Sequence, residues 1–276
     1  MVASMRIALC QIPVSSDVSV NLSRVRAALK EAAAGNAELA LFPEATMVRF
    51  GSDLRAAAEP LNGPFCTAVA EASAAEGVAS VTGVFEPSED GRVFNTVVAY
   101  SASGTQIAAY RKLHLFDALG QRESDLVAPG RAPVLTELAG APVGLEICYN
   151  IRFPELTRVL AAGGAQLVTV SAAWQAGLFK EEHWVTLLRA RAIENTVWIA
   201  AAGQVPDNDE TPTRAPTGIG RSLLIDPLGV VRHDMGPAAG VFVVDADLSL
   251  VESVRATLPS LANRRDDIFG PAAAGA

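Results

Sequence analysis

The stretch GLEICYNIRFPEL, residues 144–156, predicts a change from strand to helix around a single cysteine. The residues up to Ile147 are mostly aliphatic, as in a buried strand, and Pro154 suits the first turn of a helix. Cys148 therefore stands at the junction of the two elements. In open α/β sheets, ligands bind beyond the carboxyl ends of strands, where backbone N–H groups can stabilise an oxyanion. This position favours a nucleophile, and the alternative is a buried structural cysteine.

Strand and helix patterns alternate on both sides of this junction. The expected helices cover residues 18–34, 67–76, 154–162, 180–195 and 248–256. The expected strands cover residues 6–11, 39–42, 78–85, 93–100, 106–110, 142–147, 166–170, 197–201, 222–226 and 241–245. Runs such as LALF and QLVTVSAA are apolar at nearly every position, as in strands buried on both faces, so helices must cover the sheets. We expect one α/β domain over residues 1–270, with two layers of mixed sheet between helices, followed by a small-residue tail at 271–276.

The composition limits the class of protein. Half of the 276 residues are hydrophobic and 19% are charged, which fits a compact folded chain rather than a disordered one. The formal net charge of −8 disfavours nucleic acid or an anionic membrane surface as the main partner. No apolar stretch reaches membrane-spanning length, and no signal-peptide pattern is present, so we expect a cytoplasmic location without a membrane partner.

The three cysteines and three histidines are dispersed along the sequence. No two cysteines form a CxxC pair and no two histidines have the HxxxH spacing, so neither a metal site nor a disulfide framework is predicted. A cysteine–histidine hydrolase is also disfavoured. Only His114 follows a predicted strand end, and it lies just two positions after Lys112.

Two further strand ends carry ionisable residues. LALFPEAT places Glu44 just after the strand at 39–42, and QIAAYRKLHLFD places Lys112 just after the strand at 106–110. Taken singly, Glu44 could be a carboxylate at a helix start and Lys112 a solvated surface lysine. Together with Cys148, however, they place an acid, an amine and a thiol at the ends of three strands.

The motifs FPEA, YRKLHLFD and GLEICYNIRFPEL, in this order and at this spacing, resemble those of the nitrilase or carbon–nitrogen hydrolase superfamily. The resemblance covers nearly the whole chain. It implies a four-layer α-β-β-α sandwich, a homodimer or higher homo-oligomer, no metal or organic cofactor, and a catalytic set of Glu44, Lys112 and Cys148. Because Tyr149 follows the cysteine where nitrilases typically have Trp-Glu, the chain looks most similar to the amidase-like branches. The implied partner is a small linear amide, as for an omega-amidase or a deaminated glutathione amidase.

The implied catalytic residues suit amide hydrolysis. An amide is a poor electrophile, so the Cys148 thiolate would attack its carbonyl and form a thioester, which water then hydrolyses. Glu44 would take the thiol proton and later protonate the departing ammonia. Lys112 and the backbone N–H of Tyr149 would stabilise the tetrahedral oxyanion.

Two more carboxylates are candidates for the site. The resemblance implies that Glu123 orients the substrate and the lysine, and the alternative is Asp125 in the same polar loop. Glu146 departs from the family pattern, and strand alternation places it on the same face as Cys148. There it could bind a basic substrate group or raise the thiol pKa, or it could be a hydrogen-bonded buried acid.

Two larger side chains are candidates for substrate binding. Arg152 lies four residues after the cysteine and could bind a substrate carboxylate in a bidentate manner, or it could pair with Glu155. Trp174 ends the strand LVTVSAAW and is expected to line the pocket, although a core position is the alternative.

Two other functions remain open. Hydrolysis of an N-carbamoyl amino acid or amine would use the same three catalytic residues and differ only in the pocket. An inactive member that serves as a binding scaffold is the other alternative, since Asn150 and Glu146 both depart from the family pattern. The intact set of Glu44, Lys112 and Cys148 argues against the scaffold.

Overall fold

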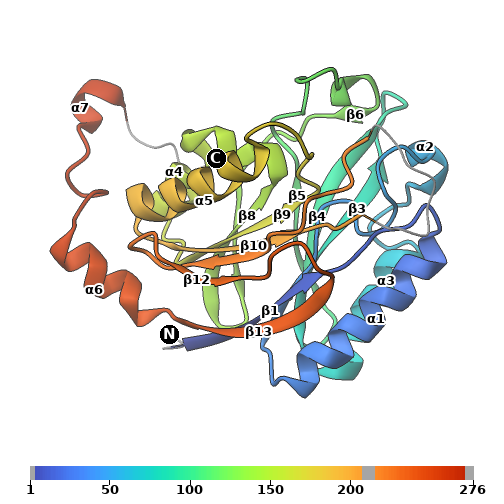
Figure 1. Cartoon of the computed structure of the whole chain (residues 1–276), viewed down its shortest axis with the longest axis horizontal. Coiled ribbons are helices and arrows are strands. Elements are labelled where there is room, and N and C mark those ends of the chain that lie inside the picture. The colour runs from blue at the N-terminus through green and yellow to red at the C-terminus, as the bar shows by residue number, and fades with distance from the viewer. Residues whose placement is uncertain (1–3, 207–214, 271–276) are drawn as a thin grey trace.

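The computed structural model describes residues 4–206 and 215–270, and the strands in these residues form two mixed sheets (Figure 1). The seven-stranded sheet has the order β13-β1-β2-β3-β4-β5, with β6 paired to β4. Its strands are β1 (Ser4–Gln11), β2 (Leu39–Leu41), β3 (Ala79–Pro87), β4 (Val93–Tyr100), β5 (Gln106–Arg111), β6 (Val127–Ala128) and β13 (Gly240–Asp247). The six-stranded sheet has the order β12-β11-β10-β9-β8-β7. Its strands are β7 (Val134–Leu138), β8 (Ala141–Ile147), β9 (Leu167–Ala172), β10 (Trp198–Gly203), β11 (Leu223–Ile225) and β12 (Val231–Asp234).

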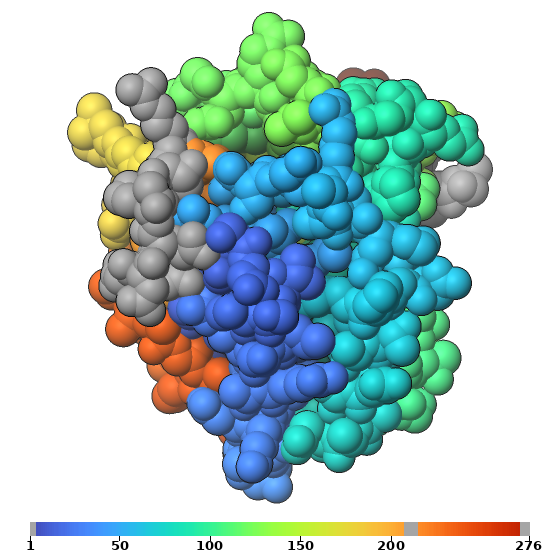
Figure 2. Space-filling model, turned by 90° about the vertical axis from the view of Figure 1, so that its right-hand side faces the viewer, coloured from blue at the N-terminus to red at the C-terminus, as the bar shows by residue number. Residues whose placement is uncertain are grey.

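Helices cover the outer faces of both sheets. The helices within the described residues are α1 (Val18–Ala34), α2 (Leu54–Ala57), α3 (Pro64–Glu76), α4 (Pro154–Ala162), α5 (Lys180–Asn195), α6 (Ser249–Thr257) and α7 (Asp266–Phe269), with short 3₁₀ turns η1 (Glu123–Asp125) and η2 (Cys148–Arg152). Figure 1 shows α4 and α5 on the outer side of the six-stranded sheet and α1 and α3 beyond the other sheet. Figure 2, turned by 90°, shows α1 and α3, in blue and cyan, covering that side of the molecule. The layers therefore follow the α-β-β-α order, which confirms the predicted fold class.

The alternation of side chains along β1 explains why this sheet is buried on both faces. Ile7 and Leu9 belong to the core between the sheets, whereas Ala8 and Cys10 pack in a second core with α1 and α3. Successive residues of a strand point to opposite faces, so an apolar residue at each position fills two layers at once. The near-continuous apolar run that predicted the strand is thus a direct consequence of the sandwich.

The two sheets are joined at the edge where the predicted catalytic strands end. The Ser171 hydroxyl of β9 donates a hydrogen bond of 2.7 Å to the carbonyl of Phe42, which follows β2 in the other sheet. This contact places the end of β2 beside the ends of β8 and β9. The residues that follow β2, β5 and β8 therefore meet in one region.

Most predicted elements match the observed ones, and the differences lie mainly at the margins of the sheets. The predicted bounds of α1, β4, α4 and α5 agree with those observed, while α3 begins earlier, at Pro64. The strands β6, β7 and β12 and the short helices α2 and α7 were not predicted. β7 and β12 lie at the edges of the six-stranded sheet, and their residues alternate between more and less exposed positions. The predicted tail at 271–276 lies outside the described residues, and the single domain over 1–270 stays a prediction. In the part of the chain that is described, no helix is long and apolar enough to cross a membrane.

Gly83 of β3 lets the loop that carries Glu44 approach the sheet. A Cβ atom at Gly83 would lie 2.6 Å from the Ala45 nitrogen and 2.7 Å from the Pro43 oxygen, which are closer contacts than real Cβ atoms make. We expect Gly83→Ala to lower the free energy of unfolding by about 1–3 kcal/mol, because backbone must move to accept the methyl group. Urea denaturation measures this change.

The matched control is Gly240→Ala, where the nearest atom would lie 3.8 Å from the new Cβ. Its effect should stay within about 0.5 kcal/mol, as for a substitution that meets no obstacle. Equal stability of the two variants would contradict the close approach at Gly83.

Candidate active site

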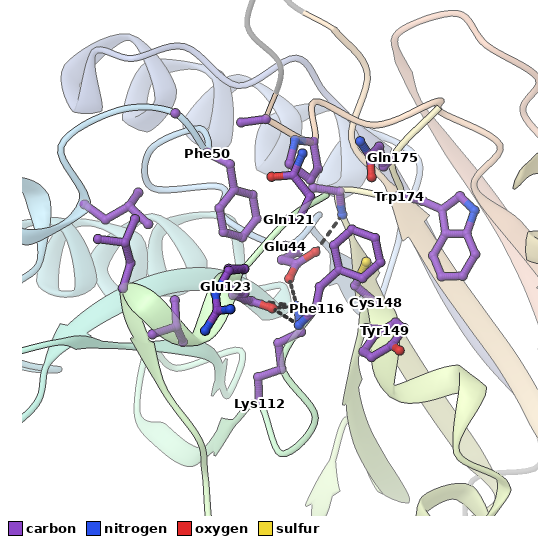
Figure 3. A pocket seen from close by; sticks show the side chains of 18 of the residues that line it. Glu44, Phe50, Lys112, Phe116, Gln121, Glu123, Cys148, Tyr149, Trp174 and Gln175 are labelled. Atoms are coloured by element: carbon purple, nitrogen blue, oxygen red, sulfur yellow. Dashed lines mark hydrogen bonds and ion pairs between the residues drawn. The ribbon is translucent and has the colours of Figure 1, made fainter. Parts of the chain in front are cut away.

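Lys112 lies between two carboxylates at the bottom of a cavity (Figure 3). Its Nζ donates hydrogen bonds of 2.8 Å to Glu44 Oε1 and of 3.0 and 2.8 Å to the two oxygens of Glu123. Lys112 and Glu44 are only 2% and 1% exposed. Burial by itself would lower the lysine pKa, but attraction to Glu123 and Glu44 outweighs it and raises the pKa of Lys112 above its ordinary value. The ammonium therefore stays charged inside the protein.

Glu44 is held in place by donors from both sheets. Its Oε1 accepts hydrogen bonds of 2.8 Å from the Asn95 amide of β4 and from Lys112, and its Oε2 accepts one of 2.9 Å from the backbone N–H of Ala173, which follows β9. Thr46 closes the loop by donating to the Pro43 carbonyl at 2.7 Å. The carboxylate is therefore oriented before any substrate binds.

Cys148 is the first residue of η2 and has a left-handed backbone conformation, with φ of 45°. This conformation costs free energy in residues other than glycine, and residues that adopt it cluster at functional sites. The turn separates Cys148 from the regular pleat of β8, and its sulfur points toward Glu44 and Lys112 in Figure 3. The prediction that Cys148 directly follows a strand is confirmed.

The surroundings of Cys148 hold its thiol in the protonated form. Burial and the neighbouring Glu44 carboxylate raise the pKa of this thiol well above its ordinary value, while Lys112 acts in the opposite direction. A thiol with a raised pKa attacks only if a base accepts its proton during the attack. Glu44 is the carboxylate placed to do this.

Asn95 contacts the candidate catalytic residues, and the sequence analysis missed it. Its amide nitrogen donates both to Glu44 Oε1 at 2.8 Å and to Glu123 Oε1 at 3.0 Å, so it bridges the two carboxylates that contact Lys112. Asn95 lies within β4 rather than at the end of a strand. The strand-end rule that found Glu44, Lys112 and Cys148 could not detect it.

Glu123 occupies the position expected of the second carboxylate. Besides Lys112 and Asn95, it accepts a hydrogen bond of 2.6 Å from the backbone N–H of Phe116. Asp125, the alternative, is exposed and pairs with Arg122 at 3.3 Å. The geometry therefore favours Glu123 over Asp125.

The cavity has a volume of about 200 Å³, which is small by the standard of drug-binding pockets. Its walls are mostly apolar, and the lining residues include Glu44, Phe50, Leu54, Lys112, Phe116, Glu123, Cys148, Tyr149, Trp174, Gln175 and Lys180. Such a cavity suits a short substrate.

The predicted substrate-binding residues divide into two groups. Tyr149 and Trp174 line the cavity, and the Tyr149 ring packs edge-on against Phe116. Arg152 is not among the lining residues. Its guanidinium carbon lies 5.0 Å from the centroid of the Trp174 ring, and one of its nitrogens lies 3.4 Å from His183 Nδ1.

Glu146 is also absent from the cavity lining. It is buried on the side of α4, where its Oε1 accepts a hydrogen bond of 2.6 Å from the Thr157 hydroxyl and its Oε2 has no partner within the described chain. Burial raises the pKa of Glu146 to about 7, although Thr157 and the charge of Arg191 lower it. This placement corresponds to the hydrogen-bonded buried acid rather than to a substrate-binding residue.

The carboxylates of the site are engaged by Lys112, and the described residues hold no group of three or more His, Cys, Asp or Glu side chains arranged to bind a metal ion. The chemistry that this chain's own residues offer is that of an acid or base, an ammonium and a thiol within one small cavity.

A model of the carbon–nitrogen hydrolase family matches residues 6–256. The chain belongs to the carbon–nitrogen hydrolase family. A Mycobacterium tuberculosis relative described as a hydrolase is 43% identical over 270 residues, which cover 95% of this chain and 96% of the relative. The deaminated glutathione amidase of Escherichia coli O157:H7 is 35% identical over 266 residues, which cover 95% and 97% of the two chains.

A solved structure supports the same family assignment. The Caenorhabditis elegans NitFhit protein superimposes with a TM-score of 0.88 at 27% identity, over 96% of this chain and 66% of that one. The resemblance inferred from the three sequence motifs is thus confirmed, and with it the assignment to enzymes that hydrolyse carbon–nitrogen bonds.

Glu146 should make the stability of this hydrolase depend on pH. Between pH 4.5 and 7 the unfolded chain has lost the Glu146 proton while the folded chain keeps it, so the folded state loses stability as pH rises through this window. The free energy of unfolding of Glu146→Gln, relative to that of the parent, should therefore rise by about 3 kcal/mol between pH 4.5 and 7. Urea denaturation at both pH values measures this difference.

An exposed carboxylate supplies the control. Glu71→Gln, on the surface of α3, should have the same free energy of unfolding as the parent at both pH values. If the difference in free energy of unfolding between Glu146→Gln and the parent were the same at both pH values, the raised pKa of Glu146 would be refuted.

Proposed function

We propose that this enzyme hydrolyses a small linear amide to a carboxylic acid and ammonia through a thioester on Cys148. The supporting observation is that Glu44, Lys112 and Cys148 line one small cavity, with Lys112 Nζ 2.8 Å from Glu44 Oε1. At the finer level we propose an omega-amidase-like or deaminated-glutathione-amidase-like activity. The relative from Escherichia coli O157:H7 named for the latter supports this choice.

In the first half of the reaction, the Cys148 sulfur bonds to the amide carbonyl carbon while Glu44 accepts the thiol proton. The carbonyl electrons move to oxygen, and the adjacent Lys112 ammonium stabilises the resulting oxyanion together with the backbone N–H of Tyr149. When the intermediate collapses, the carbon–nitrogen bond breaks. Glu44 returns its proton to the leaving nitrogen, so that ammonia departs and the thioester remains.

In the second half, water attacks the thioester carbon and Glu44 takes a proton from it. The carbon–sulfur bond then breaks, the carboxylic acid leaves, and Cys148 regains its proton from Glu44. Glu44 acts twice as a base and twice as an acid, which requires that its orientation stay constant. The hydrogen bonds from Asn95 and the Ala173 N–H support that constancy.

We also propose that the enzyme works in the cytoplasm as a homodimer or higher homo-oligomer. Its three cysteines are free thiols, which fits a reducing compartment. Ile193 on α5 and Ile268 and Phe269 on α7 are large apolar side chains left exposed in the single chain. Such side chains are candidates for burial between subunits.

The nucleophile and the base can be tested with one substitution each. We expect Cys148→Ala and Glu44→Gln each to lower kcat for ammonia release by at least about 10³-fold, because each removes a group that takes part in bond making. A panel of small ω-amides, N-carbamoyl amino acids and nitriles, read out by ammonia production, gives the parent rates. A variant that released ammonia at the parent rate would refute the mechanism, and a parent active only on N-carbamoyl compounds would refute the amide assignment.

Glu123 and Asp125 form a matched pair for testing the second carboxylate. We expect Glu123→Gln to lower kcat by about 10²-fold, since it weakens the hold on Lys112 at the oxyanion. Asp125→Asn should change kcat by less than about threefold, because Asp125 contacts only exposed Arg122 among the charged groups. Equal losses in both variants would argue against a special role for Glu123.

A further inference from the structure

Asn150, one of the two residues that depart from the family pattern, is buried beside the site but does not line the cavity. It is the third residue of η2, two positions after Cys148, and its side chain is completely shielded from solvent. A side-chain amide carries two N–H donors and an oxygen with two acceptor positions. Because buried polar groups are normally hydrogen-bonded, the partners of this amide show which parts of the chain it joins.

The contacts around Asn150 determine which side of its amide is the oxygen. One side faces the carbonyl of Ile147 at 3.0 Å and the hydroxyl of Tyr110 at 2.9 Å. The other side faces the backbone nitrogen of His114 at 3.0 Å and its ring Nδ1 at 2.9 Å. A carbonyl only accepts and a backbone N–H only donates, so Nδ2 lies toward Ile147 and Oδ1 toward His114. The amide then makes four hydrogen bonds.

These four hydrogen bonds join the two segments that carry the proposed ammonium and nucleophile. Tyr110 and His114 lie two positions before and after Lys112, in the segment where the chain leaves β5, which we call the lysine segment. The Nδ2 atom of Asn150 also binds the residue directly before Cys148, at the end of β8. Since β5 and β8 belong to different sheets, the amide bonds the lysine segment of one sheet to the cysteine turn η2 of the other.

Aromatic contacts hold the ring of His114 in place for its bond to Oδ1. The ring lies parallel to that of Phe153, with centroids 3.7 Å apart and an angle of 7° between the planes. Phe153 in turn packs edge-on against Tyr149, which lines the cavity, at 5.3 Å. Burial lowers the pKa of His114, although attraction to Glu155 raises it, so the imidazole is favoured in its neutral form. A neutral ring donates to Oδ1 only as the Nδ1–H tautomer.

The proposed reaction depends on the distance between the thiol and the ammonium. Lys112 is held by Glu44 and Glu123, whereas Cys148 lies on a left-handed turn. Such a backbone conformation costs free energy and persists only where the surrounding structure holds it. A displacement of about 1 Å between reacting groups can cost about 10²-fold in rate. A bond network that ties the cysteine turn to the lysine segment therefore bears directly on catalysis.

We propose that Asn150 is a positioning residue that holds the cysteine turn against the lysine segment, so that the Cys148 thiol and the Lys112 ammonium act on the same carbonyl group. Asn150 contacts neither the substrate nor the reacting atoms, and it acts through its hydrogen bonds to the two segments. The inference rests on the proposed amide hydrolysis and adds a residue that lies outside the cavity.

The test compares two substitutions of Asn150. Asn150→Ala removes all four hydrogen bonds, and we expect kcat for ammonia release from a small ω-amide to fall about 10²-fold with KM changed less than about threefold. Asn150→Asp keeps acceptors for His114 and the Tyr110 hydroxyl and loses the donor to the Ile147 carbonyl. Its loss in kcat should therefore stay below about tenfold.

The matched control is Asn195→Ala, because Asn195 is equally buried but is the last residue of α5. It should keep the parent kcat. Circular dichroism at the assay temperature shows which variants are folded. If Asn150→Ala does not fold, Tyr110→Phe removes a single partner of the amide and should lower kcat by about three- to tenfold.

Three outcomes would overturn the proposal: a parent-like kcat in folded Asn150→Ala, a parent-like kcat in Tyr110→Phe where Asn150→Ala does not fold, or a loss in Asn150→Asp as large as that in Asn150→Ala. A loss expressed in KM rather than in kcat would also contradict it, since the substituted residue would then affect substrate binding.

Failure of the amidase function looks different, because the parent would then release ammonia from none of the substrates. Two measurements still decide the role of Asn150 in that case. Alkylation of Cys148 by iodoacetamide, followed by peptide mass spectrometry, should slow about tenfold in Asn150→Ala and keep the parent rate in Asn195→Ala. Nitrogen-15 NMR of the parent at about pH 8, where the imidazole is neutral, should show the His114 proton on Nδ1. An unchanged alkylation rate, or a proton on Nε2, refutes the proposal.

Discussion

A buried ammonium between two carboxylates organises this site. Lys112 is almost fully buried, and its charge is maintained by Glu44 and Glu123. Removing one partner of such a group leaves an uncompensated charge, which costs several kcal/mol in typical proteins. Every other element of the site is arranged around this cluster: Asn95 bridges the carboxylates, and the Ala173 N–H fixes the free oxygen of Glu44. The charges proposed for catalysis are therefore also paired with one another inside the folded protein.

The residues proposed for catalysis could be found in the sequence because they follow strands. Glu44, Lys112 and Cys148 each come directly after an apolar run, and parallel or neighbouring strands bring such positions to one edge. Glu123 required the family motif, since nothing in its polar loop distinguishes it from Asp125 by pattern alone. Asn95 and Lys180 were missed because neither follows the end of a strand. Asn95 lies inside β4, and Lys180 is the first residue of α5.

The strands that could be predicted from the sequence are those buried on both faces. Strands covered by helices on one face and by the other sheet on the opposite face carry apolar residues throughout, and these were found. The edge strands β7 and β12 are only four or five residues long, and more exposed residues alternate along them with less exposed ones. Such a short mixed stretch looks like a loop in the sequence. Glu146 illustrates the same limit at a single residue. Strand alternation predicted that it lies beside Cys148, but the turn at Cys148 takes the cysteine out of the regular pleat of β8.

The hydrogen bond between Ser171 and the Phe42 carbonyl has a consequence for how activity arises during folding. Glu44 and Lys112 follow strands of one sheet and Cys148 follows a strand of the other. Neither sheet alone therefore carries all three residues of the proposed catalytic set. Pairings between distant parts of a chain form slowly, because the intervening loops must first be closed at a cost in entropy. On the proposed mechanism, the Cys148 thiol of a nascent chain lacks its base until the two sheets have docked, so the onset of turnover reports the completion of that docking.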